Sequence, residues 1–144
     1  MEEHGRLLLE SYARVVGKSL LEYDPEKQSA IEALFHAPFV LLSHGTEADP
    51  ILNFGNRQAL TLWEMDWQSF TSMPSRLTAE PMERSERDKL LADAKRQGYA
   101  DDIRGIRIAS SGKRFEIVAL LWNLVDEEGT YNGQAAMFKE WQFV

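Results

Sequence analysis

Hydrophobic residues recur with a helical period at the start of the chain. Leu8, Tyr12 and Val15 are followed by Val16 and Leu20, and this spacing places all of them on one stripe of an α-helix. Polar residues fill the positions between them. The pattern predicts an amphipathic helix over residues 3–21, whose apolar stripe covers the core and which could also serve in dimerisation or signalling.

Two shorter segments carry the signals of helix ends. Asp24-Pro25 predicts the start of a short helix that ends near His36, because the residue before Pro38 favours extended geometry. Asn56 is a suitable N-cap for a helix that runs to about Trp63. Beyond it, the aromatic-rich stretch before residue 74 is expected to be irregular.

Residues 81–97 predict a longer helix. Pro81 at its start, Lys95 and Arg96 in its last turn and Gly98 just beyond agree with the helix dipole and with termination by glycine. Its buried side is expected to come from Met82, Leu90, Leu91 and Ala94.

Short apolar or alternating runs predict strands over residues 39–44, 51–54, 103–109, 114–125 and 131–143. Residues 110–113, Ser-Ser-Gly-Lys, predict a hairpin turn. The run 114–125 is apolar on both faces, with Phe115 and Ile117 on one face and Leu120 and Trp122 on the other. It is therefore expected to be a central strand that is covered on both sides.

The order of these elements predicts an α+β fold with one antiparallel five-stranded sheet. The middle helices would cover one face of the sheet, and the N-terminal helix would cover the other. With 144 residues the chain is one domain's worth. We expect an N-terminal helix over residues 1–22 and one compact unit over residues 23–144.

Composition and charge narrow the function. Hydrophobic residues make up 44% and charged residues 27%, as in an ordinary globular domain, and no apolar run is long enough to span a membrane. The net charge of −7 disfavours binding to nucleic acid and to anionic membranes. The N-terminus lacks the basic and apolar regions of a signal peptide, so a cytoplasmic location is expected.

Several longer motifs resemble one family. They are Asp49-Pro50 with Ile51–Arg57, Pro74–Pro81, Gly105–Ile108, Trp122–Asp126 and Gly133–Ala136 with Trp141. Together they are similar to the MEKHLA domain, over roughly residues 4–141. The resemblance implies a PAS-like fold and a sensory or dimerisation-regulating role, in a stand-alone member of the bacterial type. MEKHLA domains also end plant homeodomain–leucine zipper regulators, but this chain has neither of those DNA-binding parts, so DNA binding is not implied.

A PAS-like fold would place a ligand pocket between the sheet and the middle helices. Asn123 and Gln134 are polar residues among apolar neighbours, and they could hydrogen-bond a ligand or be satisfied internally. Arg107 is expected on the strand face opposite Ile106 and Ile108. There it would protect an edge strand, or, if it points inward, anchor a carboxylate or phosphate. The candidate pocket residues are Phe54, Trp63, Trp67, Phe70, Arg107, Trp122, Asn123, Gln134 and Phe138.

The cofactor stays open at this point. The chain has no cysteine, which excludes the photoadduct of a light–oxygen–voltage sensor but not non-covalent flavin binding. The helix over residues 81–97 has no histidine to bind haem, and His4, His36 and His44 lack the spacing of metal ligands. All three histidines are expected to be structural.

The sequence thus predicts a non-catalytic sensory or interaction module that binds a small molecule and forms a homodimer. One alternative is a purely structural dimerisation module with a filled core. A second is a cone-shaped α+β isomerase or dehydratase, in which Asp101 or Asp102 would act within an apolar cup.

Overall fold

The computed structural model describes residues 1–144. The helices are α1 (Glu2–Val16), α2 (Ala30–Phe35), α3 (Arg57–Trp63), α4 (Trp67–Phe70) and α5 (Pro81–Gln97), with a 3-10 helix, η1 (Ser75–Thr78), before α5. The strands are β1 (Val40–His44), β2 (Leu52–Gly55), β3 (Tyr99–Ile108), β4 (Arg114–Val125) and β5 (Tyr131–Phe143). None of the helices has the length and apolar character needed to cross a bilayer.

The five strands form one antiparallel sheet in the order β2-β1-β5-β4-β3. The pairing of β5 with β1 joins the early hairpin to the late meander. The predicted α+β fold is therefore confirmed. The doubly apolar β4 is an interior strand, as predicted, although β5 occupies the middle of the sheet.

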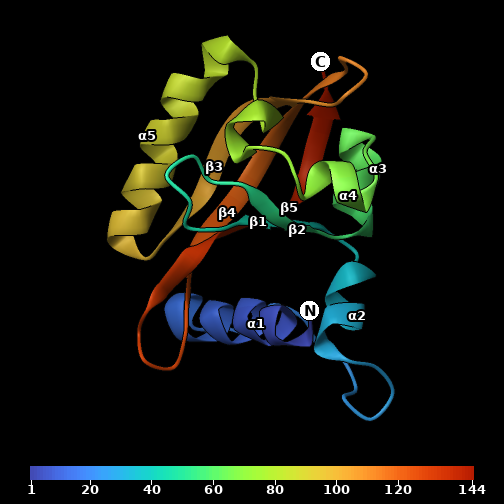
Figure 1. Cartoon of the computed structure of the whole chain (residues 1–144), viewed down its shortest axis with the longest axis vertical. Coiled ribbons are helices and arrows are strands. Elements are labelled where there is room, and N and C mark those ends of the chain that lie inside the picture. The colour runs from blue at the N-terminus through green and yellow to red at the C-terminus, as the bar shows by residue number, and fades with distance from the viewer.

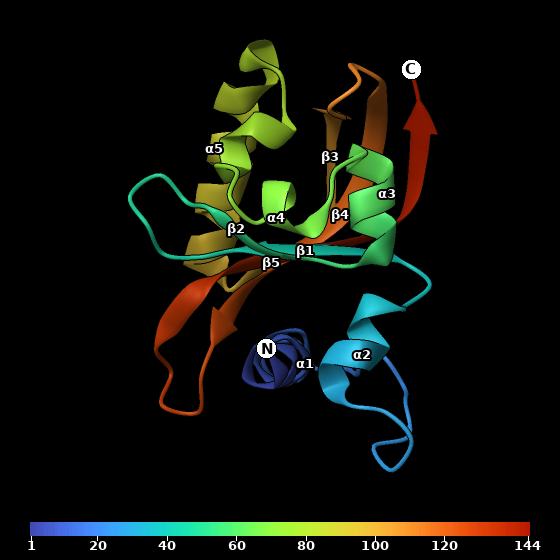
Figure 2. The ribbon, with the colours of Figure 1, turned by 45° about the vertical axis from the view of Figure 1, so that its right-hand side comes forward.

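Helices cover both faces of the sheet. Figure 2 shows α1 and α2 on one side, and α3, α4 and α5 on the other. Figure 1 shows α1 beside the end of the sheet at which a hairpin joins β4 to β5. On the α1 side, Leu8 and Tyr12 pack with Trp122 in one hydrophobic core. On the other side, Trp63 and Phe115 belong to a second core.

Several helix ends differ from the prediction. α1 stops at Gly17, whose φ of 88° gives a left-handed C-cap, instead of continuing to residue 21. α2 starts late because Ser29, not Asp24, accepts the capping hydrogen bond, from the Glu32 amide. Asp24 closes a local turn with the Glu26 amide. The stretch expected to be irregular contains α4, and η1 follows it.

The predicted cap at Asn56 is confirmed, and this residue does more than cap α3. Its Oδ1 accepts hydrogen bonds from the amides of Ala59 and Leu41, each at 3.1 Å. Its Nδ2 donates to the carbonyls of Leu34 (3.1 Å) and Phe39 (2.8 Å). A fully buried side chain thus joins α2, α3 and β1.

The bounds of α5 match the prediction, but its buried face differs. Met82 is 72% exposed, whereas Arg87 is buried together with Ala94. The helix therefore turns a cation, and not only apolar side chains, toward the sheet.

Candidate functional site

A small cavity lies between the sheet and the helices on the α5 side. Its volume is about 50 Å³, which is room for roughly three or four water molecules. Its walls come from all five strands, η1, α5 and the end of α3. The sheet supplies mostly apolar side chains, among them Leu42, Ile117 and Phe138.

The ionisable residues that line the cavity are all basic. Arg87, Arg107 and His44 line the cavity together with Ser75 and other neutral polar residues, and no Asp or Glu side chain is among the lining residues. The chain as a whole carries a net charge of −7. The cavity is thus a basic site inside an acidic protein.

Arg107 is the only buried residue of β3, at 9% exposure. Its Nη1 donates to the carbonyl of the adjacent Ile106 at 3.0 Å, and no carboxylate lies within salt-bridge distance of it. Burial, together with the positive charge of Arg87, lowers the pKa of Arg107 to about 10, so the group stays charged at neutral pH. An unpaired buried charge of this kind is costly to the folded state.

Gly105 makes room for this guanidinium. A Cβ at position 105 would lie 2.7 Å from Arg107 Nη1. Because residues two apart share a strand face, Ile103, Gly105 and Arg107 all face the cavity side of β3. The absence of a side chain at Gly105 lets Arg107 lie against the sheet.

Arg87 reaches the same cavity from α5 and is 8% exposed. Its Nη1 lies 3.3 Å from the carboxylate of the exposed Asp88, and its Nη2 donates to Ser75 Oγ. Burial lowers the pKa of Arg87, while Asp88 partly opposes that effect. Arg87 therefore has one acidic partner at the surface, and Arg107 has none.

His44 and Gln134 form the far side of the cavity. They lie directly opposite each other in the β1–β5 pairing. The His44 ring contacts the Gly45 carbonyl through Nδ1 at 2.9 Å, and burial lowers the pKa of His44, so the neutral ring is favoured. The cavity's positive charge at neutral pH thus comes from the two arginines.

The two amide residues tie α5 to the sheet. Gln134 donates to the Leu91 carbonyl at 3.0 Å, and Asn123 donates to the Lys95 carbonyl at 2.9 Å. The two amides also lie 3.4 Å apart, Gln134 Nε2 to Asn123 Oδ1. They are therefore satisfied within the protein, and only Gln134 lines the cavity.

The structure brings together four of the nine candidate residues. Trp63, Arg107, Gln134 and Phe138 line the cavity. Phe70 packs against the Trp63 ring, with 6.0 Å between the ring centres, and lies outside the lining.

The other three aromatic candidates lie elsewhere. Phe54 and Trp122 belong to the core on the α1 side of the sheet. Trp67 is 37% exposed and contacts the edge of Phe54. For Trp122 the alternation along β4 already indicates this face, because Ile117 and Ala119 line the cavity and Trp122 has the opposite parity.

Phe54 changes sides because of an irregularity in the sheet. The β1–β2 register shifts between Ser43 and His44, so that Ser43 pairs with Phe54 but His44 pairs with Leu52. One extra residue in a strand reverses the faces of the residues that follow it. Leu52 therefore lines the cavity, and Phe54 lies on the α1 side.

Two titratable residues of the cavity, Arg87 and His44, were not among the candidates. Arg87 lies four residues before Leu91 and seven before Ala94, so its position on the inner stripe of α5 was readable, although its charge suggested solvent. His44 is the last residue of the buried strand β1 and has the same parity as Leu42, which also lines the cavity. The two remaining histidines differ: His4 Nε2 contacts Ser43 Oγ at 2.9 Å on the α1 side, and His36 is the C-cap of α2.

The carboxylates of the enzymatic alternative lie outside this cavity. Asp101 and Asp102 are exposed at a register shift in β3, and Asp102 has a φ of 55°. Neither carboxylate lies in an apolar cup.

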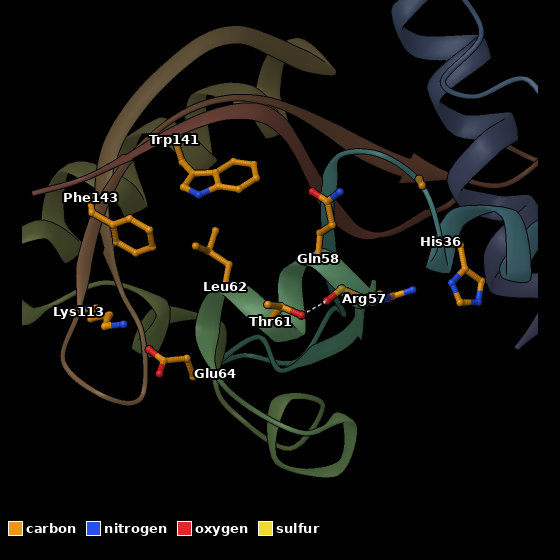
Figure 3. A pocket seen from close by; sticks show the side chains of 10 residues that line it. His36, Arg57, Gln58, Thr61, Leu62, Glu64, Lys113, Trp141 and Phe143 are labelled. Atoms are coloured by element: carbon orange, nitrogen blue, oxygen red, sulfur yellow. Dashed lines mark hydrogen bonds between the residues drawn. The ribbon is translucent and has the colours of Figure 1, made fainter.

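A second, larger depression is an open groove of about 710 Å³ between α3 and the end of β5. Figure 3 shows Trp141 and Phe143 from β5 on the side of the groove that faces Leu62 of α3. Trp141 is 38% and Phe143 56% exposed. Beyond Phe138, β5 pairs only with β4, so one backbone edge is open beside these aromatic rings.

The cavity does not fit a flavin as it stands. Pockets for molecules of that size have volumes of roughly 300 Å³ or more, several times the volume found here. The residues present suit a few waters or a small ion.

Comparison with solved structures places the fold among PAS and light–oxygen–voltage domains. A PAS domain from Colwellia psychrerythraea superposes with a TM-score of 0.70 at 13% identity, over 84% of this chain and 98% of that chain. A light–oxygen–voltage domain whose mechanism was studied with a flavin analogue gives 0.65 at 15% identity, over 84% and 88%. The light–oxygen–voltage domain of the blue-light photoreceptor Aureochrome1 gives 0.61 at 16% identity, over 88% of each chain.

These similarities define a protein with the fold of PAS-type sensory domains. The model of the MEKHLA domain family matches residues 2–143, almost the whole chain. The chain therefore belongs to the MEKHLA domain family. A comparison with curated proteins finds no match.

Proposed function

We propose that this chain is a non-catalytic sensory module that binds a small molecule in the cavity between the sheet and α5. The observation that carries the proposal is the group of buried polar side chains around this cavity, above all Arg107. A purely structural core would gain stability from apolar residues there.

The sheet offers a route from this cavity to α1. Along β4, Ile117 and Ala119 face the cavity, while Leu120 and Trp122 face α1. At the end of β4, Ser11 Oγ donates to the Val125 carbonyl at 2.8 Å and accepts from the Val125 amide at 2.9 Å. A ligand that favours one position of β4 would thereby favour one position of α1.

Release of a bound molecule tests the proposal. We expect natively purified protein to release one small molecule on denaturation, detected by mass spectrometry of the protein-free filtrate. Ala119→Val adds two methyl groups to the cavity wall and should reduce the amount released. Ala13→Val, on the exposed face of α1, is the control and should release as much as the wild type.

The structural alternative makes the opposite prediction. If the cavity is only a packing defect, the wild type releases nothing, and Ala119→Val raises the melting temperature because it fills empty space. That pair of results would contradict the ligand-binding proposal.

We further propose that the chain forms a homodimer through the groove beside β5. Two features support this surface as the dimer interface. They are the exposed side chains of Trp141 and Phe143 and the open edge of β5. The outward side of α1 carries mainly polar residues and offers no comparable apolar area.

Light scattering after gel filtration tests the dimer and should give twice the chain mass. Phe143→Ser should shift the measured mass toward that of the monomer. A monomeric wild type would contradict the proposal.

A further inference from the structure

The charges around the cavity do not balance within the protein. Arg87 and Arg107 are both more than nine-tenths buried, and both line the cavity. The only acidic group within salt-bridge distance of either is Asp88, which contacts Arg87. One positive charge therefore remains buried without a carboxylate in contact with it. Burial is the main cause of the low pKa of Arg107, and the more distant Glu83 only partly opposes this effect.

The N–H groups of Arg107 that are not used within the protein favour a hydrogen-bond acceptor in the cavity. A guanidinium matches the two oxygens of a carboxylate with parallel hydrogen bonds. The Arg107 guanidinium, which has no carboxylate within salt-bridge distance, is thus a donor group suited to an anionic ligand.

Size and surroundings restrict the anion. A volume of about 50 Å³ admits only a few non-hydrogen atoms. Much of the wall is apolar, with Leu42, Ile117 and Phe138 among its residues, which suits a short hydrocarbon tail better than a fully polar ion such as phosphate. A single uncompensated charge matches a monoanion.

We propose that the cavity binds a small monocarboxylate, whose oxygens are held by Arg107 with help from Arg87 and whose short apolar tail packs against the sheet. This inference rests on the proposed function, because it names the ligand class of the same cavity. Arg107 is then a binding residue, and Gly105 is the position that leaves space for it.

Propionate is the probe for this proposal. We expect sodium propionate to raise the melting temperature and to change the tryptophan fluorescence of the full chain in a saturable manner, with sodium chloride at equal ionic strength as the blank. Propionamide has the same shape without the charge and should have no effect. Sodium phosphate tests the alternative anion and should also have no effect.

Two arginines on β3 provide a matched pair of variants. Arg107→Met should lower the affinity for propionate about tenfold or more, because it removes a charged hydrogen-bond donor. Without ligand, Arg107→Met should be at least as stable as the wild type, since the buried charge is gone. Arg104→Gln changes an exposed arginine that pairs with Asp102 and should bind propionate normally.

The outcomes separate the ligand class from the proposed function. Equal binding of propionamide, or stronger binding of phosphate, would overturn the proposal that the ligand is a monocarboxylate. The proposal of a ligand site in the cavity would still stand. Absence of any response to propionate would also overturn the monocarboxylate, and release of a different molecule on denaturation would still support ligand binding. The titrations of the wild type need no variant, so poor folding of Arg107→Met would not prevent the test.

Discussion

At the scale of single residues, buried polar side chains determine most of what is specific to this molecule. Asn56 makes four hydrogen bonds to backbone groups from a fully buried position. Three separate elements depend on it, and no other side chain of its size could present both donors and acceptors there. The sequence predicted the cap but not the three long-range bonds.

Loss of the Asn56 amide should therefore destabilise the fold strongly. We expect Asn56→Ala to lower the free energy of unfolding by about 3 kcal/mol or more, because several buried backbone groups lose their partner. Urea denaturation followed by circular dichroism measures this change. Asn132→Ala, at a half-buried position near the start of β5, removes only local hydrogen bonds; it is the control and should change stability by less than about 1 kcal/mol. Equal effects of the two variants would contradict the role assigned to Asn56.

Arg107, unlike Asn56, is a buried polar residue that is not expected to stabilise the fold. Its side chain is buried without an acidic partner, so it is expected to cost stability in the ligand-free protein. Residues that are costly to the fold and line a cavity are typical of binding sites.

At the scale of elements, α1 is joined to the sheet by both apolar and polar contacts. Leu8 and Tyr12 pack in the core, and the Tyr12 ring meets the Trp122 ring edge-on with 4.9 Å between their centres. Near the start of the helix, His4 contacts Ser43 Oγ, which in turn donates to Asn53 at 2.6 Å. Burial lowers the pKa of His4, so the neutral imidazole belongs to the docked helix.

Acidification should therefore loosen α1. The folded-state pKa of His4 lies below its value of about 6.5 in the unfolded chain. Between these two values the unfolded state binds more protons, so the stability that the neutral ring contributes is present above about pH 6.5 and is lost as the pH falls below it. Hydrogen exchange should be faster in α1 at pH 5.5 than at pH 7.5 after correction for the intrinsic rate.

His4→Gln keeps a hydrogen-bonding group beside Ser43 and removes the titration. It should flatten part of the pH dependence, while His44, whose pKa burial also lowers, contributes the rest. His36→Gln, at an exposed position, is the control. The carboxylates with lowered pKa, such as Asp66 and Asp126, act near pH 4 and below and do not interfere. The same pH dependence in His4→Gln and wild type would contradict this account.

At the scale of the whole molecule, one sheet separates two cores with different contents. The α1 side contains a hydrophobic core without a charged residue, whereas the α5 side combines a hydrophobic core with two buried arginines. The basic cavity favours one small anion, whereas the acidic charge of the whole chain disfavours binding of an extended polyanion.

Much of the architecture was readable from the chain. A long run of residues that is apolar on both faces predicted β4 and its two covered faces, and end signals predicted both bounds of α5. These features depend on residues near one another in sequence, so local chemistry is enough to predict them. The site was only partly readable: Trp63, Arg107, Gln134 and Phe138 were expected at the cavity, whereas Arg87 was not.

The sequence by itself determined the α+β class, the order of the elements and the family resemblance, because alternation, helix caps and turn residues act over short distances. Only the tertiary structure decided which side chains meet. A one-residue shift between β1 and β2 moved Phe54 away from the cavity, and the pairing of β5 with β1 set His44 opposite Gln134. A shift in register moves side chains to the other face of a sheet, and long-range pairing brings distant residues together on one face. Neither is encoded by a local sequence pattern.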